Sequence, residues 1–440
     1  MINRIVLFVS LLVSVPLGLS AQQLTLAECV DRALTNNQNV KNAALAVTST
    51  EYEIRETKSA LLPTIDLNGQ YQYYFEVPGQ VVPANAFGGP EGAFQTVELG
   101  VPQSVSANVQ LSQTLYNQQV LLGLKAAKVA RQASTLELAL TQEELIYNVS
   151  ATYYNVQVLQ ESLQSLEKNI ENLEKSVKVN ETLKDNDLIP TSRYKRLLIN
   201  LENLKNQREN QQLQVVQNLN MLKYLMSMPI TTPLSVVPFE SNSIEGNLQA
   251  GSISNRKDIQ LQQESIRLAE LDKKSTKAGY YPSLQADLFY GYTGYNDEFN
   301  PTENINNQWI SSSYFSLSLR VPIFDGFNRK YQLKQKEVAL QQSNNTLQMM
   351  RINAEQEIQD AYNNYLSYQN LLDNNQRSLT LAEDLFKNAN VEYQNGLINI
   401  TDYLAAQDDL TDARNNYTTA LINLQLAALQ LKKANGELKP

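Results

Sequence analysis

The sequence contains no histidine among its 440 residues. Histidine is the commonest metal ligand and the side chain that most often acts as a general base near neutral pH. Only one cysteine is present, which excludes an intrachain disulfide and a thiolate-bound metal cluster. No phosphate-binding loop or nucleophile motif is found either. These absences argue against an enzyme, and we expect no cofactor and no metal site.

Positive charge is also scarce. Lys and Arg number 36 against 45 Asp and Glu, which gives a formal net charge of −9 at pH 7. Proteins that bind nucleic acid carry an excess of Lys and Arg, because contacts to the phosphate backbone dominate their affinity. We therefore expect no nucleic-acid partner.

Long apolar runs are missing except at the start of the chain. Arg4 precedes an apolar stretch over residues 5–19, and the small residues Ser20 and Ala21 follow it. This pattern predicts a cleaved secretory signal over residues 1–21. The alternative is an uncleaved anchor, but a spanning helix needs about 20 apolar residues. Cys29 lies beyond the expected cleavage site, and we interpret it as a helix residue rather than a lipid acceptor.

Glycine and proline are nearly absent from two long stretches. Residues 111–228 contain only Gly123 and Pro190, and residues 327–435 contain only Gly396. Most of the remaining glycines and prolines lie before or between these two stretches. Since Gly and Pro interrupt regular structure, the distribution predicts two long helical blocks that alternate with two blocks of another kind.

The two helical blocks repeat each other at an offset of about 209 residues, which is the sign of an internal duplication. Apolar residues recur every seven positions in both copies. The positions are Val149, Val156, Leu163, Ile170 and Val177 in the first copy and Ile358, Tyr365, Leu372, Leu379 and Phe386 in the second. A seven-residue repeat keeps one seam facing a partner helix, so it predicts coiled-coil packing. An ordinary amphipathic bundle is the alternative.

The predicted helices are too long for a compact bundle. Residues 119–184 would span about 100 Å as one helix at about 1.5 Å per residue, and residues 327–393 match them. Each long helix leads into a turn, at residues 185–190 and 394–399. Four shorter helices are also expected, over residues 25–60, 191–226, 256–277 and 401–434.

Four segments alternate apolar and polar residues with a period of two. They cover residues 64–75, 104–115, 283–293 and 313–323. Segments of about ten residues with this pattern are typical of outer-membrane barrel strands, which face lipid on one side and water on the other. Aromatic residues such as Tyr73 and Phe324 gather near the segment ends, as in interfacial girdles. A water-soluble sheet or sandwich is the alternative.

Four strands are too few to close a barrel around a water-filled pore. In lipid, an open sheet would leave edge N–H and C=O groups unpaired, at a cost on the order of several kcal/mol each. Three copies would supply twelve strands, an even number within the range of outer-membrane barrels. We therefore expect a homotrimer. The predicted fold is mainly α with a membrane β region, in which four strands per chain complete a trimeric 12-stranded β-barrel that continues as a long α-helical coiled-coil tunnel.

Several motifs resemble those of the TolC-type outer-membrane efflux and secretion channels. They lie at residues 24–37, 59–63, 278–284, 321–326 and 396–407. The resemblance covers nearly the whole mature chain. It implies a passive exit duct in the outer membrane, with its tunnel in the periplasm. It also implies four partners, namely two further copies of the chain, a periplasmic adaptor (membrane fusion) protein, an inner-membrane pump of the RND or ABC type, and outer-membrane lipid.

The same resemblance gives a domain organisation. We expect a signal peptide over residues 1–21, a first structural repeat over 22–230, a linker or equatorial region over 231–254 and a second structural repeat over 255–440. The two turns between helices would lie at the periplasmic tip of the tunnel.

Acidic residues near that tip are implied to form the pore constriction. Asp402 matches a family aspartate there, whereas Ala405 replaces the companion acid one turn later. Arg193 stands at the corresponding place in the first repeat. Asp402 and Arg193 therefore either present charge to the pore or pair with each other, and Asp185 and Asp187 add acid at the tip. All four could instead be solvated turn charges.

Apolar residues at the two turns are expected to contact the adaptor. They are Leu188 and Ile189 in the first turn and Gly396, Leu397 and Ile398 in the second. The alternative is local packing of the helix ends. A different function is a trimeric coiled-coil outer-membrane scaffold or adhesin without transport activity. Such a protein would carry its strands in one terminal block, whereas here strand pairs interrupt the helices twice.

Overall fold

The computed structural model describes residues 22–98, 100–238, 248–296 and 309–438. The expected signal and residues 239–247 of the expected linker lie outside the described residues. The chain divides into two compact units. The helical unit comprises Met1–Leu45, Leu136–Leu261 and Gln348–Pro440, and the sheet unit comprises Ala46–Thr135 and Gln262–Leu347.

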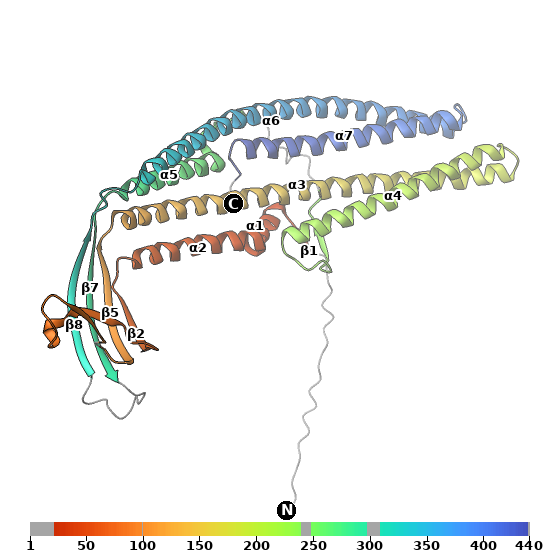
Figure 1. Cartoon of the computed structure of the whole chain (residues 1–440). Coiled ribbons are helices and arrows are strands. Elements are labelled where there is room, and N and C mark those ends of the chain that lie inside the picture. Colours follow the sequence, from red (N-terminus) through yellow and green to blue (C-terminus); the bar gives the residue numbers. More distant parts are fainter. Residues whose placement is uncertain (1–21, 99, 239–247, 297–308, 439–440) are drawn as a thin grey trace, which may run out of the picture. The chain divides into compact units, whose positions relative to one another are not determined.

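Four helices dominate the helical unit. They are α3 (Gln118–Asp185), α4 (Thr191–Leu225), α6 (Asn328–Gln394) and α7 (Ile400–Ala434). In Figure 1, α4 returns along α3 and α7 returns along α6. The seven-residue seam explains this pairing. Val149 and Val156 of α3 are buried in one cluster with Leu222 of α4.

The second helix pair packs in the same way. Ile358, Tyr365 and Leu372 of α6 are buried against α7. The α7 side of this cluster includes Ala420, Leu424, Ala427, Leu431 and Ala434. Small alanines alternating with leucines let two helices approach closely along a coiled-coil seam.

The backbone repeats the 209-residue offset that the apolar pattern predicted. Ser227 and Gly436 follow the ends of α4 and α7, and both have positive φ, 53° and 68°. The next amide donates back five residues in both cases, from Met228 to the Lys223 carbonyl and from Glu437 to the Lys432 carbonyl. This is the Schellman way of ending a helix. The internal duplication is therefore visible in local geometry as well as in sequence.

The predicted helix over residues 25–60 is wrong as a single element. It is two helices, α1 (Leu26–Asn36) and α2 (Gln38–Ser59). Asn37 between them has extended backbone angles. Its side chain accepts a hydrogen bond from the Asn39 amide at 2.9 Å and donates one to the Leu225 carbonyl at 2.8 Å. Asparagine side chains that bond to backbone groups in this way compete with helix formation.

Two short strands and the start of helix α5 (Lys257–Ala278) complete the described part of the helical unit. Strand β1 (Gln22–Leu24) pairs in parallel with β6 (Leu234–Val236). Helix α5 begins after a single 3-10 turn, Ile253–Asn255, and extends into the sheet unit. None of the described helices has an apolar stretch long enough to cross a membrane.

The sheet unit contains one four-stranded antiparallel sheet. Its strands are β2 (Thr64–Tyr73), β5 (Gln103–Tyr116), β7 (Ser283–Asn296) and β8 (Trp309–Arg320), paired in the order β2-β5-β7-β8. The register aligns Ile65, Leu111, Leu288 and Phe315 in one row across the sheet. Because side chains alternate along a strand, these apolar residues share one face.

Part of the strand prediction needs correction. The fourth strand runs over 309–320 and not over 313–323. Pro322 has no N–H to donate to a neighbouring strand, which favours an earlier end of this strand. The serine-rich start of the strand shows no alternation of apolar and polar residues, so the sequence pattern does not mark where it begins. A second hairpin was not predicted. It pairs β3 (Gly79–Pro83) with β4 (Phe94–Glu98) through a 3-10 turn at Ala84–Phe87.

Candidate functional site: the tip of the helical unit

The two turns between helices have the same backbone geometry. Asp187 has a φ of 58° and Gly396 a φ of 73°. One residue later, the Leu188 amide donates to the Leu183 carbonyl and the Leu397 amide to the Glu392 carbonyl, both at 2.8 Å. Each turn is thus a Schellman motif with a left-handed residue at its corner. Glycine adopts this conformation without strain, and aspartate is among the few other residues found there.

The leucine after each corner lies on the surface. Leu188 is 68% exposed and Leu397 is 74% exposed. In a Schellman motif this residue usually packs back onto its own helix, but here most of each side chain remains in solvent. Ile189 and Ile398 are half-buried, and Ile398 packs against a core cluster that includes Ile400 and Tyr403. Local packing therefore covers little of either leucine side chain.

The helices that follow the turns begin differently. The Asn399 side-chain oxygen caps α7 and accepts hydrogen bonds from the amides of Thr401 at 2.7 Å and Asp402 at 3.1 Å. Pro190 precedes α4 and provides no side-chain cap. Asp402 in the first turn of α7 is favoured by the helix dipole, whereas Arg193 in the first turn of α4 is disfavoured. The position of Arg193 is therefore not explained by helix stability.

A groove of about 750 Å³ lies between the two turns. All four helices and both turns contribute to its wall. The predicted site residues that line it are Ile189, Arg193, Gly396, Leu397, Ile398 and Asp402. Asp185, Asp187 and Leu188 lie outside this lining. Lys175, Val179 and Asn180 of α3 complete one side of the groove, and sequence reasoning had not selected them.

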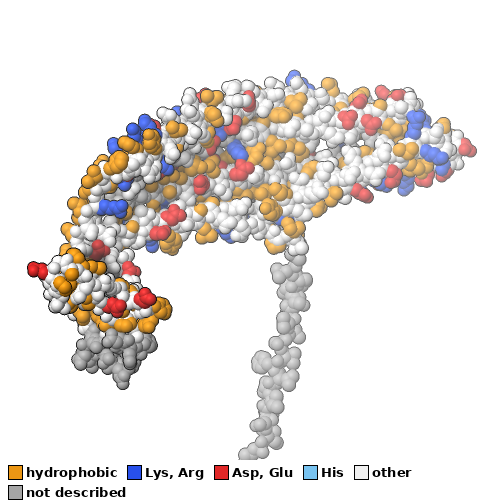
Figure 2. All heavy atoms as spheres, in the orientation of Figure 1, with side chains coloured by type: hydrophobic (Ala, Val, Ile, Leu, Met, Phe, Trp, Pro, Cys, Tyr) orange, Lys and Arg blue, Asp and Glu red, His pale blue; other side chains and the backbone are white. Residues whose placement is uncertain are grey.

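Asp402 and Arg193 both line the groove. No ion pair joins them within the part of the chain that the structure describes, although nearby tip residues do form such pairs. Lys184, for example, binds the Asp185 carboxylate at 2.6 Å, and this hydrogen bond raises the pKa of Lys184. Figure 2 shows positive and negative side chains interspersed at this end of the helices.

A hydrogen bond between Tyr393 and the buried Asn180 lies at the wall of the groove. The Tyr393 hydroxyl donates to the Asn180 side-chain oxygen at 2.9 Å, and the Asn180 amide donates to the Ser176 carbonyl at 2.8 Å. Asn180 is only 1% exposed. The Tyr393 ring stacks on Tyr403 with centroids 4.9 Å apart, and burial raises the pKa of the Tyr403 hydroxyl. The contact fixes α3 to α6 and α7 at the tip.

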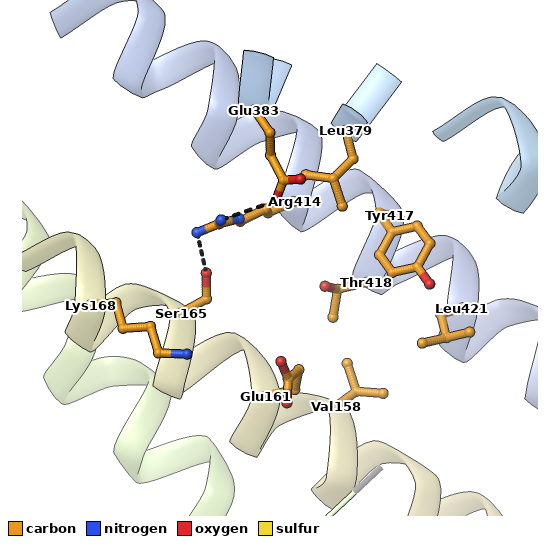
Figure 3. Close-up of a pocket in the computed structure, with 10 residues that line it drawn as sticks. All are labelled: Val158, Glu161, Ser165, Lys168, Leu379, Glu383, Arg414, Tyr417, Thr418 and Leu421. Atoms are coloured by element: carbon orange, nitrogen blue, oxygen red, sulfur yellow. Dashed lines mark hydrogen bonds and ion pairs between the residues drawn. The ribbon is translucent and has the colours of Figure 1, made fainter. Parts of the chain in front are cut away.

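A second, smaller cleft of about 380 Å³ lies further along the helices (Figure 3). Arg414 of α7 crosses it, donating to the Glu383 carboxylate at 3.1 Å and to the Ser165 hydroxyl at 3.4 Å. Asn169 of α3 donates to the Thr411 hydroxyl nearby at 3.3 Å. The interface between α3 and α7 is therefore polar in this region, in contrast to the apolar seams within each helix pair.

A protein-family model described as "Outer membrane efflux protein" matches residues 29–226 and 251–437. The chain belongs to the outer membrane efflux protein family. The two matched segments correspond to the two copies of the repeat, and together they confirm the resemblance predicted from the motifs. The Leu-Ile turns and the groove thus lie on an outer membrane efflux protein, a family of transport channels.

Solved outer-membrane channels share the fold of this outer membrane efflux protein. CusC matches with a TM-score of 0.76 and 19% identity, covering 93% of this chain and 92% of its own. CmeC of Campylobacter jejuni matches with a TM-score of 0.75 and 19% identity, covering 94% and 85%. The open state of MtrE of Neisseria gonorrhoeae matches with a TM-score of 0.71 and 18% identity, covering 93% and 88%.

A search of curated proteins finds no match. The predicted fold class, mainly helical with a membrane β region and an internal duplication, is confirmed by the structural matches. The family and these neighbours support an outer-membrane exit duct.

Proposed function

We propose that three copies of this chain form a passive outer-membrane exit duct. The duct docks on a periplasmic adaptor protein and, through it, on an inner-membrane pump of the RND or ABC type, as part of a tripartite efflux or type I secretion system. The chain carries no catalytic step in this proposal, because the pump supplies the energy. Residues 22–230 and 255–440 form the two repeats, each with two barrel strands and a long helix flanked by shorter helices.

The observation that carries the proposal is the four-stranded sheet. Its apolar face is solvent-exposed in the single chain, with Ile65 and Phe315 both 68% exposed. Its outer strands are β2 and β8, and each has one unpaired edge within the described sheet. Lipid can cover the apolar face, but only strands of neighbouring copies can satisfy the edge N–H and C=O groups.

The tip supports the docking part of the proposal. Two exposed leucines and a groove with apolar and polar lining lie at the same end of the helical unit. Exposed apolar side chains beside a groove are typical of surfaces that bind a partner protein. In the trimer these surfaces repeat three times around the axis, and the adaptor contacts them from the periplasm. Asp402 stands beside them and narrows the pore as an acidic ring.

Measurements of oligomeric mass and of ion conductance test whether the protein forms a trimeric duct. The protein, extracted from outer membranes in detergent, is expected to be a trimer by light scattering and to give single-channel conductance in planar bilayers. A trimer without conductance would favour the scaffold or adhesin. A stable monomer that needs no detergent would contradict the proposal altogether.

A further inference from the structure

The polar face of the sheet carries one aromatic pair. The register aligns Asp66, Gln110, Phe289 and Tyr314 in a single row across the four strands. The neighbouring rows on this face contain no aromatic residue and include Asn68, Asn108 and Ser112. The rings of Phe289 and Tyr314 stack with centroids 4.9 Å apart and an interplanar angle of 11°.

The aromatic pair is accessible from the polar side. Tyr314 is 52% exposed and Phe289 is half-buried. The Phe289 ring extends over Gly291, where an added Cβ would come within 3.0 Å of the ring and 2.7 Å of the Asn108 Cβ. Glycine at this position therefore lets the ring lie against the strand, and the two stacked rings lie near the middle of the length of β7 and β8.

Two carboxylates lie on the same face of the sheet as the pair. Asp66 stands in the same row, and Asp287 stands in the next row, where it accepts hydrogen bonds from the Ser112 hydroxyl at 2.7 Å and the Gln285 amide at 3.0 Å. Among the described strand residues of this face, Arg320 at the end of β8 is the one cation. The middle of the face thus combines aromatic surface with carboxylates.

We propose that Phe289 and Tyr314 form a stacking site for planar aromatic cations on the inner wall of the barrel. The inference rests on the proposed trimeric duct, because only a closed barrel in lipid turns the polar face toward a water-filled interior. Aromatic rings attract flat rings by stacking and cations through their π faces, and the carboxylates add attraction for positive charge. Three copies place three such sites around the pore.

Current block in planar bilayers tests the site, with ethidium as the planar cation and tetraethylammonium as a cation without rings. Ethidium is expected to block the wild-type channel, and Phe289→Leu to weaken its apparent affinity about fivefold. Leucine keeps an apolar side chain in the strand but has no flat face. Phe289→Tyr should keep the block, and Phe289→Leu should weaken any block by tetraethylammonium less than the block by ethidium, because tetraethylammonium can use the π face of the ring but cannot stack on it.

The matched control is Tyr290→Leu, which removes an aromatic ring from the opposite, apolar face of the same strand. It should leave the ethidium block unchanged. Tyr314→Leu provides a second test if Phe289→Leu does not assemble as a trimer. Equal ethidium block in wild type, Phe289→Leu and Tyr314→Leu would overturn the proposed stacking site but would not contradict the proposed duct. A wild-type protein without conductance would contradict the proposed duct itself.

Discussion

The Tyr393 hydroxyl donates a 2.9 Å hydrogen bond to the side-chain oxygen of Asn180, 213 positions away in the chain. The two residues lie on α6 and α3, the long helices of the two repeats. Asn180 is 1% exposed, so this hydrogen bond pairs a buried side-chain oxygen. This bond therefore links the two repeats immediately behind the turns that carry the proposed adaptor contact.

Tyr393→Phe should loosen the tip while leaving the rest of the helical unit intact. The substitution leaves the Asn180 oxygen buried without its donor, at a cost of about 1–3 kcal/mol. Hydrogen exchange is expected to increase at the ends of α3 and α6 and to stay unchanged around Val149 and Tyr365. Tyr224→Phe is the control, since Tyr224 is 66% exposed. Unchanged exchange at the tip of Tyr393→Phe would show that the bond does not stabilise it.

Much of the helical unit could be predicted from the sequence because its packing is periodic. A seven-residue spacing determines which residues face a partner, and Val149, Val156, Ile358 and Tyr365 are buried as that spacing requires. The break at Asn37 could not be predicted in this way. Besides the local bond from the Asn39 amide, it involves a hydrogen bond to the Leu225 carbonyl, 188 residues away, and local sequence does not encode that distant contact. The three-residue strands β1 and β6 are likewise too short to show a period.

The candidate site likewise has parts that the sequence predicts and parts that it does not. The two Leu-Ile turns could be found from the 209-residue offset, because Schellman ends are determined by a few neighbouring residues. The groove between them could not, since it depends on how four helices pack. The sequence does not mark Asn180 as a site residue, because a single asparagine in a helix usually points to water. The sequence likewise placed Arg193 and Asp402 near each other but could not show whether they pair.

Leu397→Asp should abolish export while leaving the trimer intact. Leu397 is 74% exposed and lines the tip groove, so a charge there costs the single chain little but would have to be desolvated against an apolar partner. Leu397→Met keeps an apolar side chain of similar size and is the control that should retain export. The measurement is the drug resistance or secretion of a deletion strain carrying each variant, with trimer content assayed in parallel. Normal export by Leu397→Asp would exclude this contact.

Asp402→Asn should reduce the preference of the channel for cations. In the proposed trimer, three Asp402 carboxylates would surround a narrow axis, where they would favour cations and repel anions, and the substitution would remove these three charges. The reversal potential under a KCl gradient should move toward that of a non-selective pore, with the change largest at low salt because ions screen the ring. Asp409→Asn, on an exposed residue further along α7, provides a charge-matched control. An unchanged reversal potential in Asp402→Asn would show that the carboxylate does not face the conduction path.

Arg256 should contribute stability that disappears in acid. Its guanidinium holds both oxygens of Asp258, at 3.1 and 2.7 Å, and donates to Glu357 of α6 at 2.6 Å. Burial opposes ionisation of Asp258, but the hydrogen bonds and charge of Arg256 outweigh it and lower the pKa of the carboxyl below its ordinary value of 3.8. A carboxyl whose pKa is lower in the folded state stabilises the fold above its unfolded pKa, and this contribution is lost as pH falls through the folded pKa.

Arg256→Met is therefore expected to lower the free energy of unfolding by about 2 kcal/mol at pH 7, a value kept modest because both partners remain partly exposed to water. At a second, acidic pH below the lowered pKa of Asp258, the difference from wild type should shrink, since Asp258 is then protonated in both proteins. Thermal unfolding of the detergent-extracted proteins at the two pH values measures the difference in stability between Arg256→Met and wild type. Lys175→Met is the control, because Lys175 and Glu171 form an exposed pair within one helix, whose loss should have little effect at either pH. A destabilisation of Arg256→Met that is equal at both pH values would point to lost packing and not to the Asp258 pair.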